Sequence, residues 1–533
     1  MHLTRKKRGK RTYYYAVQNK RFGNKVRSDK QIYLGTAESI ANAMSGKTQP
    51  NLLHTKSFGD IALLLYIERL LDIENIFNKN LNKKRKNSVS GKYYLSVIFN
   101  RILKPKSKAG INDWLKTTVL DWYWNISTSS QKFWNHLEYL DDETIKNICD
   151  EIAGKSFELI SDSEFLWDTS NYFTYMKNND SEVLGKGKSK QGRHEKNLVC
   201  HGLLVGRESG IPLQHFPYKY KHDSKVMNEK ISEIIEFLNK YKKQDFTLVF
   251  DKGNNSKDNI KAISKYNFIG SLRSEQAKDL FNIPTAKYEY NYKSTKDNEV
   301  LVHDAGLHKY YGSEYRIMLS YEKASYKRQK MAFEKSLKDT FDKYENIKGK
   351  EFKTQMAAMN ALNKILPKKN LKAYNKDIVE KGKFWCVLLS KNEEEIKLYG
   401  QSFGKTALIT NKSKSVPVDI VKAYRSLIVV ENQFRALHNS FMIPITPIYE
   451  WTDQKIKAHI FLCFVALVIA RVLEYISKQK GLNITFSRLL ETAENIRIGL
   501  LTDGKKAKYC LEQMTVEEQK LMGLFELHKY LVV

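Results

Sequence analysis

The chain is poor in cysteine: it has five in 533 residues, and no two of them are spaced as CxxC. Zinc modules and dithiol redox sites use such closely spaced pairs, and disulfide frameworks need a higher density of cysteines. The sequence therefore argues against a zinc site and against a disulfide framework. It is typical of a protein from a reducing cytoplasm.

Signals for secretion, membrane insertion and ATP binding are also missing. The N-terminus, MHLTRKKRGKR, runs into YYYAV rather than a long apolar core, so we expect no signal peptide. The longest apolar stretch, residues 460–470, is shorter than the ~20 residues of a membrane span and predicts a buried helix. No GxxxxGK[ST] stretch occurs, so no P-loop is predicted. We expect a cytoplasmic protein without a membrane partner.

Acidic residues are few relative to basic ones. Lys and Arg total 90 against 59 Asp and Glu, which gives a net charge of +31. Such a charge attracts polyanions, and duplex DNA carries about one charge per 1.7 Å of its axis. Nucleic acid is therefore the leading partner, and a basic protein from a lysine-rich proteome is the alternative. When bound to DNA, we expect the protein to be associated with the nucleoid. Hydrophobic residues make up 42 %, enough for a sizeable core and too many for a disordered chain.

The first 160 residues show two patterns. Residues 1–50 alternate basic and aromatic residues around a Phe22-Gly23-Asn24 turn, which predicts a β-hairpin with a cationic face for DNA, or else an ordinary hairpin packed on the body. Residues 51–160 carry apolar residues at helical spacing and predict an accessory helical domain that contacts DNA. Four of the seven tryptophans fall there, and we expect them in its core.

From residue 161 the pattern changes to alternating strands and helices. The predicted elements are a strand over 165–167 that ends at Asp168, a hairpin over 197–205 and 211–216, a helix over 224–240, a strand over 246–250 that ends at Asp251, a short helix, and a strand over 268–272. This order of elements is that of a ribonuclease-H-like α/β fold.

Residues 274–410 interrupt this core. They contain strand-like pieces around a highly charged helical stretch over 323–366, most simply a solvated helix face. Helices over 418–439 and 453–478 follow. The predicted domains are a basic β-hairpin arm (1–50), a helical domain (51–160), the first part of the core (161–273), a β-rich and helical insertion (274–410), the second part of the core (411–480) and a C-terminal helical segment (481–533).

Two aspartates follow runs of apolar β-formers. Asp168 and Asp251 are therefore expected at the carboxyl ends of core strands, where ligands bind in open α/β sheets. Divalent ions such as Mg²⁺ prefer carboxylate oxygens, and two ions about 3.5–4 Å apart can promote in-line phosphoryl displacement. Taken singly, each aspartate has an alternative interpretation as an ordinary strand-end or turn residue.

A glutamate lies within an apolar helix, AYRSLIVVENQFR. Helical spacing predicts that Tyr424, Glu431, Arg435 and His438 share one face. A carboxylate in such a helix is costly if it is buried without a partner. Arg435, one turn further on, can satisfy it as an ordinary ion pair, and this is the alternative to a catalytic role.

At these residues the sequence resembles a known family. The segments WDTSNYF, VFDKGNNS, YRSLIVVENQFRALHNSF and PITPIYEWTDQKIKAHIFLCFVALVIARVLE resemble insertion-sequence transposases of the IS-four superfamily. The N-terminal segment from YYYAV to KVRSDKQIYLGT resembles them too, so the likeness covers most of the chain. It implies that Asp168, Asp251 and Glu431 hold Mg²⁺, for which Mn²⁺ can substitute. It also implies that Tyr424 touches the transposon end and that 274–410 is the β-rich insertion domain of the group.

The chain departs from the family pattern at two positions. Leu427 stands where the family has Arg, and His438 stands where it has Lys. Arg425 lies near the first position but on another helix face, and Arg435 is the candidate replacement. A histidine is mostly neutral near pH 7, so the departures affect the predicted phosphate contacts rather than the metal site.

Three further features carry less weight. Arg273 is a candidate phosphate contact at a strand end. Residues 254–256 are expected to cap the helix after Asp251. Trp385, in the insertion, is expected in the core rather than holding a flipped base.

The resulting prediction is a cut-and-paste DNA transposase. It would cut at the terminal inverted repeats of its element and join the ends to target DNA, as a homodimer when two ends are paired. Two alternatives remain open: a DNA-binding descendant that has lost the chemistry, and a nuclease of the same fold without strand transfer. The intact acids oppose the first, and the replaced Arg and Lys favour it.

Overall fold

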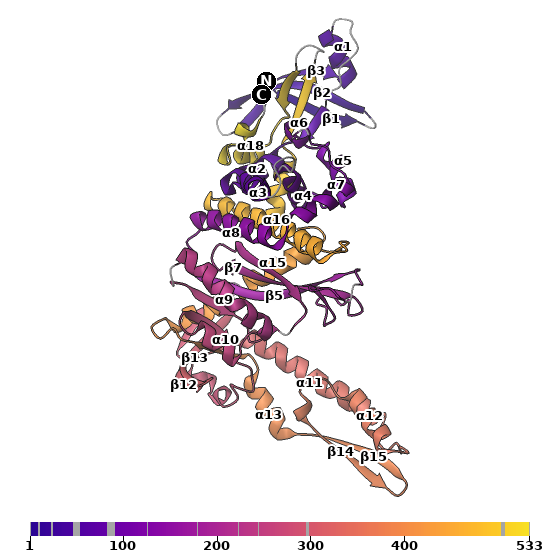
Figure 1. The fold of residues 1–533 in the computed structure, drawn as a ribbon, viewed down its shortest axis with the longest axis vertical. Coiled ribbons are helices and arrows are strands. Elements are labelled where there is room, and N and C mark those ends of the chain that lie inside the picture. The colour runs from indigo at the N-terminus through magenta and orange to yellow at the C-terminus, as the bar shows by residue number, and fades with distance from the viewer. Residues whose placement is uncertain are drawn as a thin grey trace. The chain divides into compact units, whose positions relative to one another are not determined.

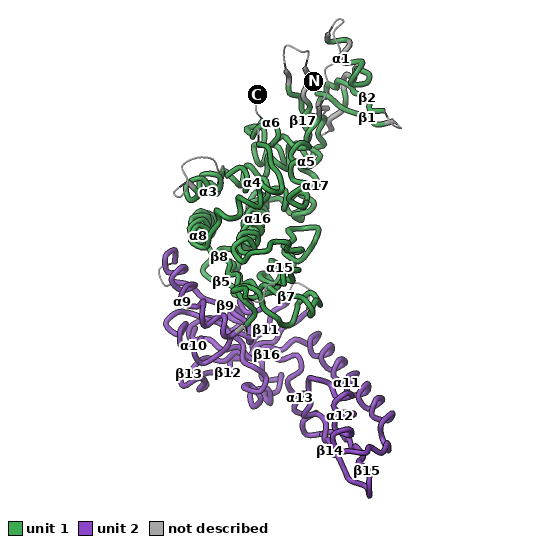
Figure 2. The backbone as a smooth tube through the Cα atoms, turned by 45° about the vertical axis from the view of Figure 1, so that its right-hand side comes forward, with its two compact units in different colours: residues 1–221, 428–533 green, residues 222–427 purple. Residues whose placement is uncertain are grey.

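The computed structural model describes residues 2–8, 11–22, 25–45, 54–82, 91–124, 126–177, 180–221, 223–242, 245–294, 298–502 and 507–531. It forms two compact units, coloured separately in Figure 2. The first unit combines residues 1–221 with residues 428–533, and the second unit consists of residues 222–427. Both units mix helices and strands, and Figure 1 labels the elements.

The sheet of the first unit is built around β5 (Glu164–Thr174) and β7 (Asn197–Gly206), which pair antiparallel. β8 (Pro212–Lys219) and the short β6 (Leu184–Gly185) also pair with β7, so the predicted hairpin is confirmed. The prediction that the strand ends at Asp168 is wrong. β5 continues to Thr174 because residues 169–174 find hydrogen-bonding partners along β7, which a polar run such as TSNYFT does not signal by itself.

A long apolar helix forms the core of the first unit. α16 (Asp453–Gln479) begins at the N-cap Thr452 and packs against α2 (Gly59–Leu71), α4 (Gly91–Leu103), α8 (Asp142–Leu159) and β8. Among the described residues it is the one helix long and apolar enough to cross a membrane, but 89 % of its most apolar window is buried. The predicted buried helix is therefore present and longer than its most apolar stretch. The other helices of this region are α3 (Ile73–Asn82), α5 (Ile111–Leu115), α6 (Leu120–Trp124) and α7 (Ser130–His136).

The ends of the chain form two small sheets in the first unit. β1 (His2–Arg8), β2 (Arg11–Phe22) and β3 (Lys25–Gly35) are antiparallel, and α1 (Ala37–Ser45) packs on them. The predicted hairpin is thus confirmed with one extra strand, while its turn residues Gly23 and Asn24 lie outside the described residues. The C-terminal segment, predicted to be helical, also contains strands. Its elements are α17 (Phe486–Glu494), β17 (Arg497–Thr502), β18 (Ala507–Leu511) and α18 (Val516–Leu524), and β17 pairs with β4 (His54–Ser57).

The second unit contains a mixed sheet. β9 (Thr247–Phe250) and β10 (Asn267–Ser271) are parallel and joined by α10 (Lys257–Ile263), which confirms the predicted strand–helix–strand order. The predicted helix before β9 is α9 (Asp223–Lys242). From β10 the sheet continues antiparallel through strands of the predicted insertion: β16 (Lys405–Thr410), β13 (Ser313–Glu322), β12 (Glu299–Tyr310) and β11 (Tyr290–Lys293).

A smaller substructure of the second unit has its own apolar core. The predicted charged helical stretch is two helices, α11 (Lys323–Glu345) and α12 (Gln355–Ile365). They pack with the hairpin β14 (Tyr374–Lys381) and β15 (Phe384–Lys391) and with α13 (Glu393–Ser402). Trp385 packs against this core, as expected from its apolar neighbours.

The helix predicted over 418–439 is interrupted. α14 (Pro417–Arg425) ends before Ser426, and α15 (Leu427–His438) begins after it. The Ser426 hydroxyl donates to the Ala423 carbonyl oxygen at 2.6 Å, a local side-chain contact of the kind that bends or ends helices. α14 belongs to the second unit and α15 to the first, apart from its first residue.

Candidate catalytic acids

Asp168 lies in the middle of β5. Side chains alternate along a strand, so Asp168 shares one face of β5 with Ser170 and Tyr172. Its Oδ1 atom accepts a hydrogen bond from the Thr169 backbone N–H at 2.7 Å, and the side chain is half-buried. The carboxylate is thus anchored to the strand.

α15 is fastened to the same face of β5. The His438 Nε2 atom lies 3.0 Å from the Ser170 hydroxyl oxygen, and the His438 ring lies 4.7 Å from the Tyr172 ring. At the other end of the helix, Val429 lies beside Gly210 in the turn that follows β7. Since that turn adjoins the start of β5, α15 runs along β5 in the same direction, and the stretch that bears Glu431 lies alongside the stretch that bears Asp168.

Two further contacts fix the rotation of α15. The Phe434 ring meets the His201 ring of β7, with centroids 6.1 Å apart. Gln433 accepts a hydrogen bond from Arg471 of α16 at 2.5 Å. Gln433, Phe434 and Leu437 are buried, so the opposite face, with Glu431, is turned outward.

Glu431 is therefore exposed rather than enclosed by its apolar neighbours. Its side chain is 51 % exposed, and Arg435 lies 3.4 Å away with 66 % exposure. The Glu431–Arg435 ion pair, which was the alternative to a catalytic role for Glu431, is present. An exposed i,i+4 pair contributes only about 0.3–0.5 kcal/mol to stability. Arg435 thus leaves Glu431 available to another ligand.

His438 is turned into the unit. Burial, with a smaller effect from the Lys190 charge, lowers the pKa of His438 to about 4. The ring is therefore neutral near pH 7 and contacts Ser170. In the family that the sequence resembles, this position carries Lys. In this chain, His438 instead connects α15 to β5, which no pattern in the sequence signals.

Asp251 follows β9 directly, as predicted. Its Oδ1 atom accepts hydrogen bonds from the Gly253 backbone N–H at 2.9 Å and from Asn254 Nδ2 at 2.8 Å. The Ser256 hydroxyl accepts from the Asn259 backbone N–H at 3.2 Å and caps α10, which confirms the expected cap. This loop orients the Asp251 carboxylate at the carboxyl end of a parallel strand, where open sheets bind ligands.

Arg273, Arg425 and Tyr424, the predicted DNA contacts of the second unit, lie in three different environments. Arg273 follows β10 and is exposed. Arg425 donates to Glu322 Oε1 at 2.9 Å. Burial raises the pKa of Glu322, but the Ser325 hydroxyl and the Arg425 charge lower it more, so the net pKa lies below its usual value. Tyr424 lies on α14 and Glu431 on α15, so the single helix that was predicted to carry both residues is interrupted at Ser426.

The three predicted acids are divided between the units. Asp168 and Glu431 belong to the first unit and Asp251 to the second. Across the residues that the structure describes, no group of three or more His, Cys, Asp or Glu side chains is placed to hold a metal ion. The convergence of the three acids therefore stays a prediction.

A basic loop beside β5 was missed by the sequence reasoning. Residues 186–196, KGKSKQGRHEK, carry five cations against one acid. Lys190 Nζ donates to the Thr169 carbonyl oxygen at 2.6 Å, and its backbone N–H donates to Asn171 Oδ1 at 2.9 Å. The density of cations between two strands is the signal that could have singled this loop out.

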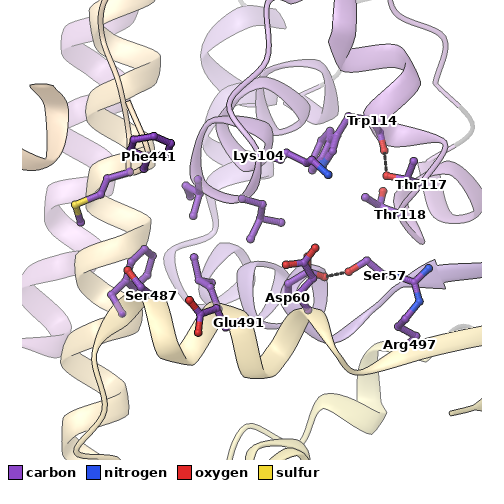
Figure 3. A pocket seen from close by; sticks show the side chains of 16 residues that line it. Ser57, Asp60, Lys104, Trp114, Thr117, Thr118, Phe441, Ser487, Glu491 and Arg497 are labelled. Atoms are coloured by element: carbon purple, nitrogen blue, oxygen red, sulfur yellow. Dashed lines mark hydrogen bonds between the residues drawn. The ribbon is translucent and has the colours of Figure 1, made fainter. Parts of the chain in front are cut away.

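A separate cavity of the first unit contains none of the predicted site residues. It measures about 450 Å³, and Figure 3 shows Asp60, Lys104, Glu491 and Arg497 among its lining side chains. Asp60 is buried and accepts a hydrogen bond from the Ser57 hydroxyl at 2.5 Å, while burial raises the pKa of its carboxyl group. This buried carboxyl group stabilises the start of α2.

No protein-family model matches the sequence, and no curated protein matches it. The chain is similar to a piggyBac transposase in a synaptic complex with hairpin DNA, with 9 % identity and a TM-score of 0.39 over 81 % of this chain and 79 % of that one. It is also similar to a Mos1 transposase in a paired-end complex with the left transposon end, with 10 % identity and a TM-score of 0.16 over 33 % of this chain and 56 % of that one. Both likenesses are distant.

Proposed function

We propose that this chain is a metal-dependent DNA transposase of the DDE type, with a ribonuclease-H-like catalytic core. Asp168, Asp251 and Glu431 are its catalytic acids. The observation that carries the proposal is the attachment of α15 along β5, which keeps Glu431 and Asp168 on neighbouring stretches of the first unit. The resemblance of the motifs around all three acids to insertion-sequence transposases supports the same assignment.

The three carboxylates suit Mg²⁺, with Mn²⁺ as a substitute. They are oxygen donors, Asp168 and Asp251 are partly exposed, and Glu431 is exposed with only a surface ion pair to Arg435. When bound, such ions activate the attacking group and neutralise the charge that builds up on the phosphate. The chain's own contribution is to orient the carboxylates: Thr169 anchors Asp168, Gly253 and Asn254 anchor Asp251, and the α15 contacts position Glu431.

The proposed substrate is the duplex DNA of terminal inverted repeats, followed by target DNA. The net charge of +31 supports tight, salt-dependent binding to phosphates. Arg273 and Arg435 are exposed and are the proposed phosphate contacts. Arg435 also pairs with Glu431, and Arg425 pairs with Glu322. Pairing of two transposon ends calls for a homodimer.

The test combines nicking and binding on the purified chain. Its DNA substrate is a duplex from the region that flanks its own gene, with Mg²⁺ or Mn²⁺ added. We expect Asp168→Asn, Asp251→Asn and Glu431→Gln each to abolish nicking, because each removes an anionic donor. DNA affinity should stay within a few-fold, since phosphates are contacted by Lys and Arg.

Two exposed acids of the second unit provide matched controls. Asp258→Asn on α10 and Glu236→Gln on α9 remove the same charge from positions without a proposed role, and they should nick like the unchanged chain. Loss of nicking in the controls, or full nicking in any of the three acid variants, would refute the assignment of the acids.

A retired DNA-binding descendant is the second candidate function. One observation favours this candidate: His438 is neutral near pH 7 and contacts β5, whereas the family that the sequence resembles has a lysine at this position. An unchanged chain that binds its flanking DNA but nicks nothing with either metal ion would support this candidate over the transposase.

A further inference from the structure

Two exposed tyrosine rings are stacked on each other at the C-terminal end of β5. Tyr175 follows the strand directly, and Tyr449 lies in the loop before α16. Their ring centroids are 6.0 Å apart and the rings are parallel within 10°. Tyr175 is 42 % exposed and Tyr449 is 63 % exposed, so the pair presents flat aromatic surface to solvent.

The two loops that carry the rings are held together by backbone contacts. Thr174 pairs with Ile448 in a parallel bridge, and the Thr174 hydroxyl donates to the Ile448 carbonyl oxygen at 3.1 Å. The Tyr449 backbone N–H donates to Glu450 Oε2 at 3.1 Å, and Glu450 is itself buried. The rings therefore stand on fixed backbone, which lowers the entropic cost of using them for binding.

The basic loop supplies cations next to these rings. The Lys196 ammonium lies 5.1 Å from the Tyr175 ring centroid, and the Arg193 guanidinium lies 6.0 Å from the Phe173 ring centroid. Lys190 belongs to the same loop and contacts β5 beside Asp168. The loop thus places cations at three points along β5: Lys190 at the Thr169 backbone, Arg193 at Phe173 on the face opposite to Asp168, and Lys196 at Tyr175.

We infer that the Tyr175–Tyr449 pair, with Lys196 and Arg193, is a docking platform for an unpaired stretch of DNA. Exposed aromatic rings beside cations bind single strands, because a base stacks on a ring while its phosphate meets a cation. Bases of an intact duplex are already stacked on each other and do not offer their faces. The choice of DNA over RNA rests on the proposed function, whereas the platform itself does not depend on catalysis.

The platform lies several nucleotides from the candidate cutting site. Asp168 and Tyr175 are seven residues apart, which corresponds to roughly 23 Å along an extended strand. At a rise of about 3.4 Å per nucleotide this is about seven nucleotides, and fewer if the DNA strand is stretched. The platform is therefore separate from the candidate cutting site and displaced from it along β5 by several nucleotides.

The test measures binding without divalent metal, so that no cutting is needed. A labelled single-stranded DNA of mixed sequence is compared with the blunt duplex of the same sequence by fluorescence polarisation. We expect Tyr449→Leu to weaken single-strand binding by about five-fold or more, the effect of losing one stacked base. Duplex affinity should change by less than about two-fold, since the variant removes no charge.

Three variants serve as controls for this interpretation. Tyr449→Phe keeps the ring and should bind like the unchanged chain. Tyr290→Leu removes a ring of 42 % exposure from the second unit and should have no effect. Lys196→Gln should lower the salt slope of single-strand binding by about 0.7, the loss of one phosphate contact. Equal unfolding temperatures for the two Tyr449 variants confirm that the fold is retained.

Several outcomes would overturn the inference. These are a parallel loss of single-strand and duplex affinity in Tyr449→Leu, an equal loss in Tyr290→Leu, or no change in any variant. Tighter binding of single-stranded RNA than of DNA would overturn the choice of DNA. A chain that binds single strands through Tyr449 but never nicks supports the platform and refutes the proposed transposase activity, so the two failures are distinguishable.

Discussion

Replacing Lys108 with methionine should destabilise the first unit by about 3 kcal/mol. Lys108 makes a close contact with Glu450, whose side chain is only 2 % exposed. His459 Nδ1 lies 3.5 Å from Glu450 Oε1, and the Tyr449 N–H donates to Glu450 Oε2. Burial alone would raise the pKa of Glu450, but the charges of His459 and Lys108 hold it below its usual value.

The expected magnitude follows from what the variant leaves behind. Removing one partner of a buried ion pair costs about 3–5 kcal/mol, because the remaining charge is left uncompensated. His459 and one backbone N–H still contact Glu450 in Lys108→Met, so we expect the lower end of this range. Lys108→Met combined with Glu450→Gln should be less destabilised than Lys108→Met alone, since no carboxylate is then buried.

The pH dependence gives a second check. Burial lowers the pKa of His459, but the Glu450 carboxylate raises it by more than burial lowers it, so the net pKa lies above its usual value. Protonated His459 therefore stabilises the fold below its unfolded pKa of about 6.5, and this stabilisation is lost as the pH rises through the raised folded pKa. The cost of Lys108→Met should accordingly be larger at pH 9 than at pH 6.

The assay is urea unfolding followed by tryptophan fluorescence. Six of the seven tryptophans belong to the first unit, with Trp385 as the exception, so the signal reports mainly this unit. Lys155→Met is the matched control, because Lys155 and Glu158 form a largely exposed pair that should contribute less than about 0.5 kcal/mol. A change in Lys108→Met no larger than in this control, at both pH values, would refute the reasoning.

Two further perturbations test the core and the loop after β9. Burial lowers the pKa of His201 and His215, the latter to about 3, so stability should be complete above about pH 6.5 and fall as the pH drops toward 3. His215→Phe should reduce this acid sensitivity in unfolding temperatures measured from pH 7 to pH 4, and an unchanged slope would contradict the assignment. Gly270→Ala would place a Cβ atom 2.7 Å from Asn255 Oδ1 and should displace the loop after β9, lowering the nicking activity that we propose. Gly400→Ala meets no atom within 4 Å and should leave nicking intact; equal effects of the two would argue against the steric reasoning.

Periodicity predicted the elements whose apolar pattern is strong and local. The hairpin β7–β8, the order β9–α10–β10 and the helices α9 and α16 all follow from such patterns. The continuation of β5 beyond Asp168 did not, because TSNYFT becomes a strand only through its pairing with β7. The break at Ser426 was missed for a similar reason, since neither proline nor glycine marks it.

The sequence singles out the candidate acids, whose role stays a prediction, but it does not predict their surroundings. Sequence motifs single out Asp168, Asp251 and Glu431 without reference to packing. The helix around Glu431 is apolar on several faces, so its orientation depends on Ser170 and on Phe434 packing against β7. The exposed tyrosine pair joins two segments more than 270 residues apart, a proximity that no local pattern contains.

The position of α16 along the chain has a consequence for biosynthesis. Its packing partners α2, α4 and α8 are all made before residue 160, whereas α16 itself is made only after residue 452. On the ribosome, the helices of the first unit must therefore wait for almost 300 residues before their central partner emerges. Contacts of such long sequence separation slow folding and expose apolar surface in the meantime. A message that stops before codon 453 would yield a chain whose first unit lacks its central helix, so a prematurely terminated copy should be degraded rather than compete with the full-length protein.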